Sequence, residues 1–197
     1  MDNRKMLCDN ELVQQFVCGD HSAIETLINR HKNRVYTYIV LIVKNQHLAE
    51  DIFQDTFMKV INSLKRGRYV ENGKFVSWVI RIAHNLIIDH FRKEKHLNTI
   101  SNDDTEYDLF NSSKFSDINA EDALVHTQIT KDVKELVNRL PLEQREVVVM
   151  RHYMELSFKE IADQTGVSIN TALGRMRYAL INMRRMIEEK NMNLNLV

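Results

Sequence analysis

The sequence contains few residues that interrupt helices, with one proline and five glycines among 197 residues. Proline and glycine are the least favourable residues inside a helix, so their scarcity favours long helices and an all-helical (all-α) fold. No run of about eighteen apolar residues is present, which argues against a segment inserted in a membrane. The two cysteines, Cys8 and Cys18, lack zinc-ligand spacing and are expected to be free thiols in a reducing compartment.

The sequence also lacks the patterns that mark secretion or catalysis. The first ten residues contain no apolar signal core, which favours a cytoplasmic protein. There is no nucleophile-elbow serine and no glycine-rich phosphate loop, so neither an enzyme nor a bound cofactor is expected. Asp89 and His90 follow His84 at offsets of five and six rather than four, which disfavours a metal site on one helical face.

Charge is distributed unevenly although the net charge is zero. Residues 21–97 contain thirteen basic and seven acidic side chains, whereas residues 98–127 contain one basic and seven acidic side chains. A protein that bound nucleic acid through its own charge alone would usually be more basic. The composition therefore suggests that any DNA binding by the free protein is weak and requires a partner.

Apolar residues recur at spacings of three and four in several segments, which predicts amphipathic helices. The expected helices cover residues 11–19, 23–43, 48–64 and 75–95, and then residues 121–138 and 142–153. Residues 98–120 are rich in Asn, Asp and Ser without a period, which is typical of a flexible acidic linker. A spacer that only adds solubility is the alternative interpretation of this segment.

Residues 157–183 have the pattern of a helix-turn-helix. Ser157 and Glu160 form an S-x-x-E capping box for a first helix, and Gly166 can end that helix in the left-handed conformation. Ser168 can cap a second helix. The buried stripe of that second helix is expected to comprise Ala172, Leu173 or Met176, Ala179 or Leu180, and Met183. Its outward arginines suit the major groove of DNA, although an ordinary helical hairpin with a solvated basic face would share this pattern.

Four segments, taken in order, resemble one known family. They are residues 24–40 (IETLINRHKNRVYTYIV), 47–64 (HLAEDIFQDTFMKVINSL), 75–93 (FVSWVIRIAHNLIIDHFRK) and 140–177 (LPLEQREVVVMRHYMELSFKEIADQTGVSINTALGRMR). The second is close to the signature A-E-D-hydrophobic-x-Q-[DE]-x-F, and the third is near W-L-x-x-I-A-x-N-x-x-x-D-x-x-R. On these motifs the chain resembles the extracytoplasmic-function (ECF) subfamily of bacterial RNA polymerase sigma factors.

The resemblance implies a transcription initiation factor of two small helical domains. Residues 1–97 would bind core RNA polymerase and melt the −10 promoter element, and residues 121–197 would read the −35 element as duplex. The acidic linker, residues 98–120, would thread toward basic channels of the polymerase. The implied partners are promoter DNA and core polymerase, through the clamp helices of its largest subunit and its flap region. Family members are often bound by an anti-sigma factor, but this sequence does not indicate a contact site for one.

The second motif would dock on the clamp helices. Its acidic and amide side chains recur at helical spacing, with Lys59 on the same expected face, and the residues expected to bind polymerase are Glu50, Asp51, Gln54 and Asp55. Such a face can meet a complementary basic coiled coil. A solvated helix face is the alternative interpretation.

The third motif and the loop before it would contact the −10 element. From the loop, which is longer and more basic than is usual in the family, the expected contacts are Arg66, Arg68, Tyr69, Asn72 and Lys74. From the following helix they are Arg81, His84, Asn85, Arg92 and Lys93. Cationic side chains suit phosphates and an aromatic ring can stack on an unpaired base. Trp78 falls on the core-facing side of this helix and is expected to be buried.

The last motif would read the −35 element through the second helix of the helix-turn-helix. The expected contacts are Asn170, Thr171, Leu173, Gly174, Arg175, Arg177 and Tyr178. Many relatives carry a basic residue where this chain has Leu173, which can touch a thymine methyl but cannot bind a phosphate. A different −35 preference is therefore expected. The alternative function is a stand-alone helix-turn-helix regulator, which would bind duplex DNA without polymerase and would leave the second motif without a role.

Overall fold

The computed structural model describes residues 7–70, 73–98 and 133–189. The chain divides into two compact units, Met1–Thr105 and Glu106–Val197, which are described separately below. Every regular element within the described ranges is a helix, which confirms the all-helical prediction. The predicted linker, residues 98–120, lies outside the described residues except for Asn98, the last residue of a helix.

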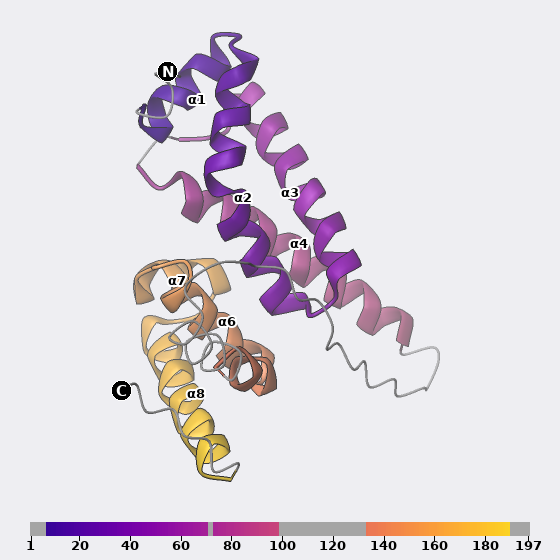
Figure 1. Cartoon of the computed structure of the whole chain (residues 1–197), viewed down its shortest axis with the longest axis vertical. Coiled ribbons are helices and arrows are strands. Elements are labelled where there is room, and N and C mark those ends of the chain that lie inside the picture. The colour runs from indigo at the N-terminus through magenta and orange to yellow at the C-terminus, as the bar shows by residue number, and fades with distance from the viewer. Residues whose placement is uncertain (1–6, 71–72, 99–132, 190–197) are drawn as a thin grey trace, which may run out of the picture. The chain divides into compact units, whose positions relative to one another are not determined.

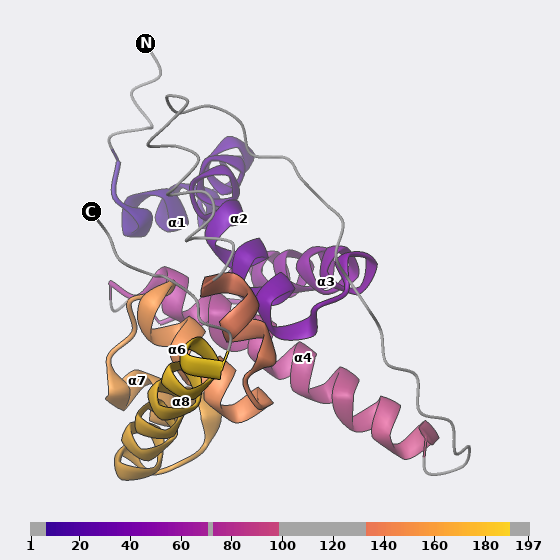
Figure 2. The same cartoon turned by 60° about the horizontal axis from the view of Figure 1, so that its bottom comes forward.

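Four helices form the N-terminal unit. They are α1 (Asp9–Val17), α2 (His21–Val43), α3 (Gln46–Lys65) and α4 (Phe75–Asn98). Helix α2 packs against the other three, and α3 also packs against α4 (Figures 1 and 2). Each helix agrees with its predicted range to within three residues at either end.

Short-range polar contacts fix where α2 and α3 begin and end. The Asp20 carboxylate accepts a hydrogen bond from the Ser22 amide at 3.0 Å, and the Asn45 side chain accepts one from the Leu48 amide at 3.1 Å. Between these helices Lys44 adopts a left-handed conformation with φ of 58°. Because side-chain caps satisfy amides that lack a helical partner, the turn between α2 and α3 is set locally by the sequence.

The carboxylate of Asp9 links helix α1 to α2. Asp9 accepts hydrogen bonds from Arg30 at 2.6 Å and from the His31 ring at 2.8 Å. Burial by itself would raise the pKa of Asp9, but the hydrogen bonds from His31 and Arg30 outweigh it and lower the pKa. Cys8 and Cys18 flank this helix as exposed free thiols, as expected.

His84 is buried, which contradicts its predicted place on the DNA-facing side of α4. Its side chain is 5% exposed, and its Nδ1 lies 3.1 Å from the hydroxyl of the fully buried Tyr38 on α2. Burial lowers the pKa of His84 to about 4, so the ring is neutral near pH 7. The prediction that it lies on the exposed side was wrong because His84 is four positions after Ile80 and three before Ile87, both fully buried, so it belongs to the buried stripe of α4. Its role is to join α2 and α4.

The C-terminal unit begins, within the described residues, with a helical segment over 133–139. Helices α6 (Leu142–His152), α7 (Phe158–Thr165) and α8 (Ile169–Glu189) follow, and α8 packs against both α6 and α7 (Figures 1 and 2). The predicted helix over 121–138 is therefore described only from residue 133 onward. The helices expected from the helix-turn-helix pattern are confirmed as α7 and α8.

The predicted helix signals of the helix-turn-helix are confirmed. Ser157 and Glu160 form the capping box at the start of α7, and Gly166 ends that helix with φ of 68°. The Ser168 hydroxyl accepts a hydrogen bond from the Thr171 amide at 3.0 Å at the start of α8. Local sequence chemistry thus sets both the turn and the start of the second helix.

Helix α8 approaches its neighbours through small side chains. Ala172 and Ala179 are fully buried, whereas Met176 and Met183 are half-buried. Of the alternatives left open by the sequence, Met176 and Ala179 therefore belong to the packed side, and Leu173 and Leu180 remain 44% exposed. Alanine at the contact lets the helix lie close to α6 and α7 while its opposite side stays accessible to a partner.

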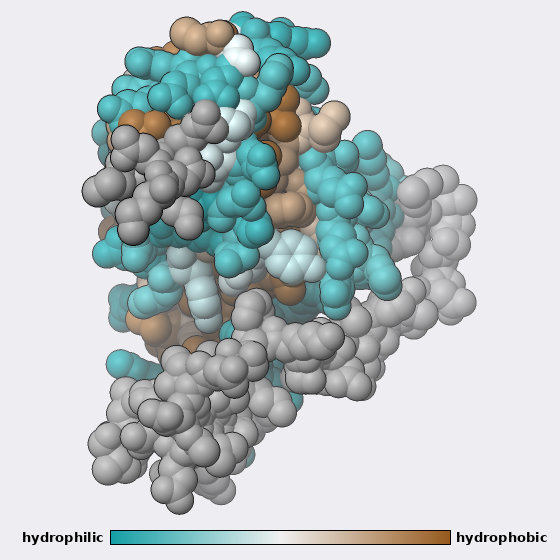
Figure 3. Space-filling view, turned by 45° about the horizontal axis from the view of Figure 1, so that its top comes forward, coloured by the Kyte–Doolittle hydropathy of each residue, from teal (hydrophilic) through white to brown (hydrophobic). Residues whose placement is uncertain are grey.

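Hydrophilic residues predominate in the view drawn in Figure 3, with smaller hydrophobic patches between them. None of the helices described by the structure is both long and apolar enough to cross a membrane.

The buried imidazole of His84 gives a prediction for the pH dependence of stability. Its pKa is about 4 in the folded chain, against an ordinary value of 6.5, so only the unfolded chain takes up this proton as the pH falls from 6.5. We expect this group to cost on the order of 2 kcal/mol of stability between pH 6.5 and 4. Denaturant titrations at several pH values should show the loss in the wild type and a smaller one in His84→Asn. An NMR titration placing the pKa of His84 near 6.5 would contradict the assignment.

Candidate polymerase and nucleic-acid interfaces

Helix α3 exposes an acidic and amide face opposite its buried stripe. The side chains of Glu50, Asp51, Gln54 and Asp55 are exposed, as expected for a docking surface. On the other side of the helix Ala49, Ile52 and Val60 are buried and anchor it to the unit. The helix therefore presents its carboxylates from a backbone that packing holds in place.

An exposed methionine continues this face, and sequence analysis did not select it. Met58 lies one turn beyond Gln54 and Asp55, and its side chain is 60% exposed. Large apolar side chains at such positions often mark contact sites, and methionine adapts to uneven partner surfaces. Its four-residue spacing from Gln54 was the signal, but the helical period did not separate it from core residues such as Phe57. We define the α3 face as Glu50, Asp51, Gln54, Asp55 and Met58.

A basic hollow lies where the end of α3 meets α4. It has a volume of about 380 Å³ and is lined by Lys59, Asn62, Ser63, Arg66, Arg68, Ile82 and Asn85. The structure thus brings together three of the residues predicted to contact the −10 element, namely Arg66, Arg68 and Asn85. Asn62, which was not predicted, also lines the hollow. Lys59, which was predicted to lie on the acidic face of α3, lines this basic site instead. Three cations beside two amides suit a nucleic-acid strand.

Helix α4 extends this positive surface along its length. Arg81, Asn85 and Arg92 are exposed at spacings of four and seven, which places them on one side of the helix. Arg92 lies 3.8 Å from Asp89, an exposed pair that leaves the guanidinium accessible. Lys74, just before the helix, and Lys93 are exposed as well. Asn72 falls outside the described residues, so its predicted contact has no structural description.

The aromatic residues next to the loop pack on one another. The Tyr69 ring lies 4.5 Å from the Trp78 ring and 5.8 Å from the Phe75 ring, between ring centroids. Tyr69 is half-buried, so one of its faces is occupied by the protein. Trp78 is also half-buried rather than buried, because it stands at the edge of this cluster. The expectation that Trp78 belongs wholly to the core is therefore wrong.

The outward side of α8 carries most of the residues predicted to read the −35 element. Asn170, Arg177 and Tyr178 are exposed, the last at 63%. Thr171 is exposed too, but its hydroxyl lies 2.9 Å from that of Ser168 in the cap of the helix. These residues form a polar stripe opposite the buried alanines, in the arrangement that a major groove accepts.

Gly174 leaves a gap in this stripe. It lies in the middle of α8, and a Cβ placed on it would meet no protein atom within 4 Å. Glycine inside a helix costs about 1 kcal/mol relative to alanine. Packing within the chain does not explain why a glycine stands here. Close approach of a partner to the helix backbone would explain it.

Arg175, unlike Arg177, is not fully exposed. Its side chain is half-buried, and it acts electrostatically on Glu146, a residue of α6 that is 4% exposed. Burial raises the pKa of Glu146 to about 7, and Arg175 opposes this rise more than any other charged group. The structure therefore separates Arg175 from the exposed arginine of the same helix, Arg177.

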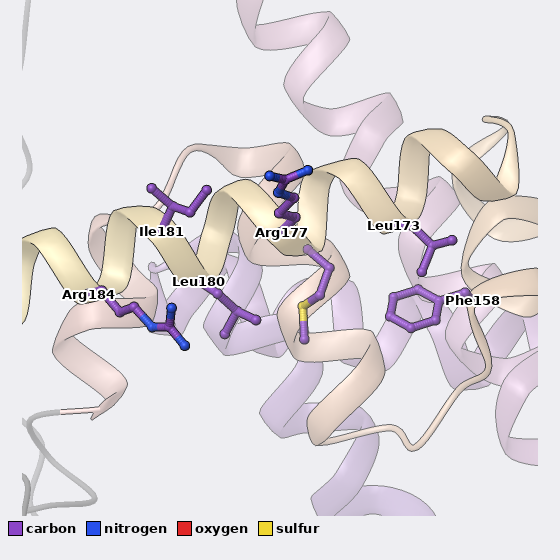
Figure 4. Close-up of a pocket in the computed structure, with 7 residues that line it drawn as sticks. Phe158, Leu173, Arg177, Leu180, Ile181 and Arg184 are labelled. Atoms are coloured by element: carbon purple, nitrogen blue, oxygen red, sulfur yellow. The ribbon is translucent and has the colours of Figure 1, made fainter.

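Leu173 lies in an apolar groove between α7 and α8. The groove has a volume of about 530 Å³ and is lined by Phe158, Leu173, Met176, Arg177, Leu180, Ile181 and Arg184. Figure 4 shows Leu173 pointing toward the Phe158 ring, with Arg177 and Ile181 projecting to the other side of α8 in this view. Leu180 and Ile181 are 44% and 47% exposed, so an apolar surface with basic edges runs along this flank of the helix. The sequence pattern left open whether Ala179 or Leu180 is buried, so this surface was not predicted.

Within the described ranges 7–70, 73–98 and 133–189, no group of three or more His, Cys, Asp or Glu side chains is arranged to hold a metal ion.

Comparison with known proteins agrees with the geometry of both units. Residues 27–97 match the family model described as Sigma-70 region 2, and residues 130–177 match the model described as Sigma-70, region 4. The first match includes α3 and α4, and the second includes α6, α7 and the start of α8. The two matches therefore fall on the elements that carry the exposed faces described above.

Similar proteins align over most of the chain. RNA polymerase sigma factor CarQ of Myxococcus xanthus is 30% identical over 178 residues, which cover 90% of this chain and 96% of CarQ. ECF RNA polymerase sigma factor SigW of Bacillus subtilis is 26% identical over 180 residues, covering 90% of this chain and 95% of SigW. The sigma factor RpoE, solved with the anti-sigma factor NepR from Bartonella quintana, shares the fold with a TM-score of 0.67 at 17% identity, over 84% of this chain and 96% of RpoE. The chain belongs to the ECF group of RNA polymerase sigma factors.

Proposed function

We propose that this sigma factor directs core RNA polymerase to promoters by dividing three contacts between its two units. The N-terminal unit binds the polymerase through α3 and the −10 element through α4 and the hollow beside it. The C-terminal unit reads the −35 element as duplex through α8. The observation that carries this proposal is that each of these helices exposes a polar or charged stripe opposite the stripe it buries.

The α3 face supports polymerase binding because it combines carboxylates with one exposed apolar side chain. Asp51 and Asp55 can pair with basic residues of a partner helix, while Met58 supplies apolar contact area. Interfaces commonly join an apolar centre to a charged rim that orients the partner. The clamp helices of the polymerase largest subunit are the proposed partner of this face.

The basic hollow and the α4 stripe support capture of a −10 strand. Lys59, Arg66 and Arg68 surround the hollow and can neutralise phosphates, while Asn85 at its edge can bond to a base. Arg81, Arg92 and Lys93 continue the positive surface, and Lys74 lies just before α4. A melted strand needs charge neutralisation and a site for an extruded base, and this surface offers both.

The outward stripe of α8 supports duplex reading. Asn170 stands at the N-terminal end of the helix, where recognition helices meet base edges, and its amide can pair with adenine. Arg177 and Tyr178 follow two turns later and suit guanine or phosphate contacts. The apolar groove beside Leu173 lies on the flank of the same helix, and we assign it to the flap region of the polymerase.

The partners in this proposal are core RNA polymerase and promoter DNA, and the chain itself performs no covalent chemistry. It acts in the cytoplasm, where bacterial polymerase meets the chromosome. An anti-sigma factor is included as a further partner, because the similar structure of RpoE contains one.

Reversal of charge on the α3 face tests the polymerase contact. Asp51→Arg combined with Gln54→Ala should weaken core polymerase binding at least about a hundredfold, or about 2.8 kcal/mol, because a like charge then faces the basic partner. Both residues are exposed, so the helical content should not change. Glu25→Arg, an exposed site on α2, is the matched control. Unchanged affinity for core polymerase in the double variant would refute the interface.

Removal of Arg177 tests the reading helix. Arg177→Ala should weaken duplex −35 binding by about 1–3 kcal/mol if the guanidinium contacts a base, as measured by fluorescence anisotropy of the polymerase complex. Lys134→Ala removes one exposed cation elsewhere in the same unit and should have little effect. Equal losses in the two variants would mean that α8 reads no sequence.

Substitution of Gly174 separates stability from DNA binding. Gly174→Ala should raise the stability of the C-terminal unit by about 0.5–1 kcal/mol, because alanine favours a helix and its Cβ meets no protein atom. The same methyl group should weaken duplex binding if DNA approaches this gap. Thermal unfolding and anisotropy give the two quantities. A variant that gains stability and keeps full affinity would show that the gap faces no DNA.

A further inference from the structure

A series of short contacts leads from α1 through α2 to the start of α4. Asp9, the first residue of α1, lies with one carboxylate oxygen 2.8 Å from Nε2 of His31 on α2. The His31 ring in turn lies 5.7 Å, between centroids, from the ring of Phe75, the first residue of α4. His31 therefore contacts both α1 and α4, although it belongs to neither of them.

The Asp9 carboxylate is held by a second partner. Arg30 donates to its other oxygen at 2.6 Å and to the carbonyl oxygen of Leu7 at 2.9 Å. The side chain of His31 is 11% exposed, so the protein encloses it on most sides in addition to the bond with Asp9. A ring that is both packed and bonded to a fixed carboxylate keeps one orientation.

Phe75 connects this pair to the aromatic residues beside the −10 loop. Its own side chain is 2% exposed, and its ring centroid lies 5.8 Å from that of Tyr69 and 5.9 Å from that of Trp78. Tyr69 and Trp78 are half-buried, and their ring centroids are 4.5 Å apart. We define these two residues as the aromatic shelf, because they offer aromatic surface on which an unpaired base can stack.

We propose that Asp9 and His31 are positioning residues that hold Phe75, and through it the aromatic shelf, in the orientation on which an unpaired −10 base stacks. The inference rests on the proposed capture of a −10 strand by the N-terminal unit. Neither residue touches DNA. Helix α1 precedes residues 27–97, which match Sigma-70 region 2, and it gains a role in promoter opening through this contact.

Positioning affects base stacking and phosphate binding differently. Rings that are already held in place lose little freedom when a base stacks on them, so more of the stacking free energy appears as affinity. The phosphate contacts of Arg66 and Arg68 depend on charge and salt, and they do not involve the shelf. Loss of the contact between Asp9 and His31 should therefore weaken the binding of bases while phosphate binding persists.

Asp9→Ala tests the proposal in the full chain. The probes are a short single strand of DNA with mixed bases and an abasic strand of the same length and charge. We expect the variant to bind the mixed strand about three- to tenfold more weakly and the abasic strand as the wild type does, with an unchanged salt slope for both. Without DNA, acrylamide should quench Trp78, the single tryptophan of the chain, more strongly than in the wild type.

Two further variants keep the outcome decisive. Glu25→Ala removes one exposed carboxylate from α2 and should bind both strands as the wild type does. His31→Leu fills the space against Phe75 but cannot bond to Asp9, so it should show the same selective loss, and adding Asp9→Ala to it should cause no further loss. His31→Leu carries the test even if Asp9→Ala does not fold.

Three results would overturn the proposal. The first is wild-type affinity for the mixed strand in a folded variant. The second is a loss of equal size for the mixed and abasic strands, which would indicate a general structural role. The third is a pair of losses that add in the double variant, since Asp9 would then not act through His31.

Failure of this inference differs from failure of the proposed function. If the N-terminal unit captures no strand, Arg66→Ala leaves the binding of both strands unchanged. If it captures a strand but Asp9 does not position the shelf, Arg66→Ala still weakens the binding of both strands while Asp9→Ala keeps wild-type affinity.

Discussion

Burial of one apolar stripe on each helix is the constraint on which both units depend. In the N-terminal unit α2 packs on α1, α3 and α4, so only the opposite sides of α3 and α4 are left for partners. In the C-terminal unit the contact of α8 is made by Ala172 and Ala179, whose small side chains permit a close approach. The same packing that stabilises each unit thus selects which side chains a polymerase or a promoter can meet.

Charges of one sign are gathered on separate faces of the protein, although they cancel over the whole chain. The α3 face is acidic, the hollow beside α4 is basic, and the net charge of the sequence is zero. A chain balanced in this way gains little from non-specific attraction to DNA. Its contacts with DNA become effective when polymerase holds both units on one promoter. Linked binding sites raise the overall affinity without any new contact.

The sequence predicted the helices well because helical period and local caps are short-range properties. The capping box at Ser157 and the left-handed Gly166 could be predicted for this reason. It placed His84 wrongly and left open whether Ala179 or Leu180 is buried, since which side of a helix turns inward depends on neighbours distant in the chain.

The most direct measurement of the central claim is run-off transcription with purified core polymerase over a library of random promoter sequences. The account predicts transcripts only when the chain is present, from templates that share two short elements at a fixed separation. Each element would correspond to one unit of the protein. Tight, sequence-specific binding by the free chain, together with transcription that does not depend on it, would contradict the account.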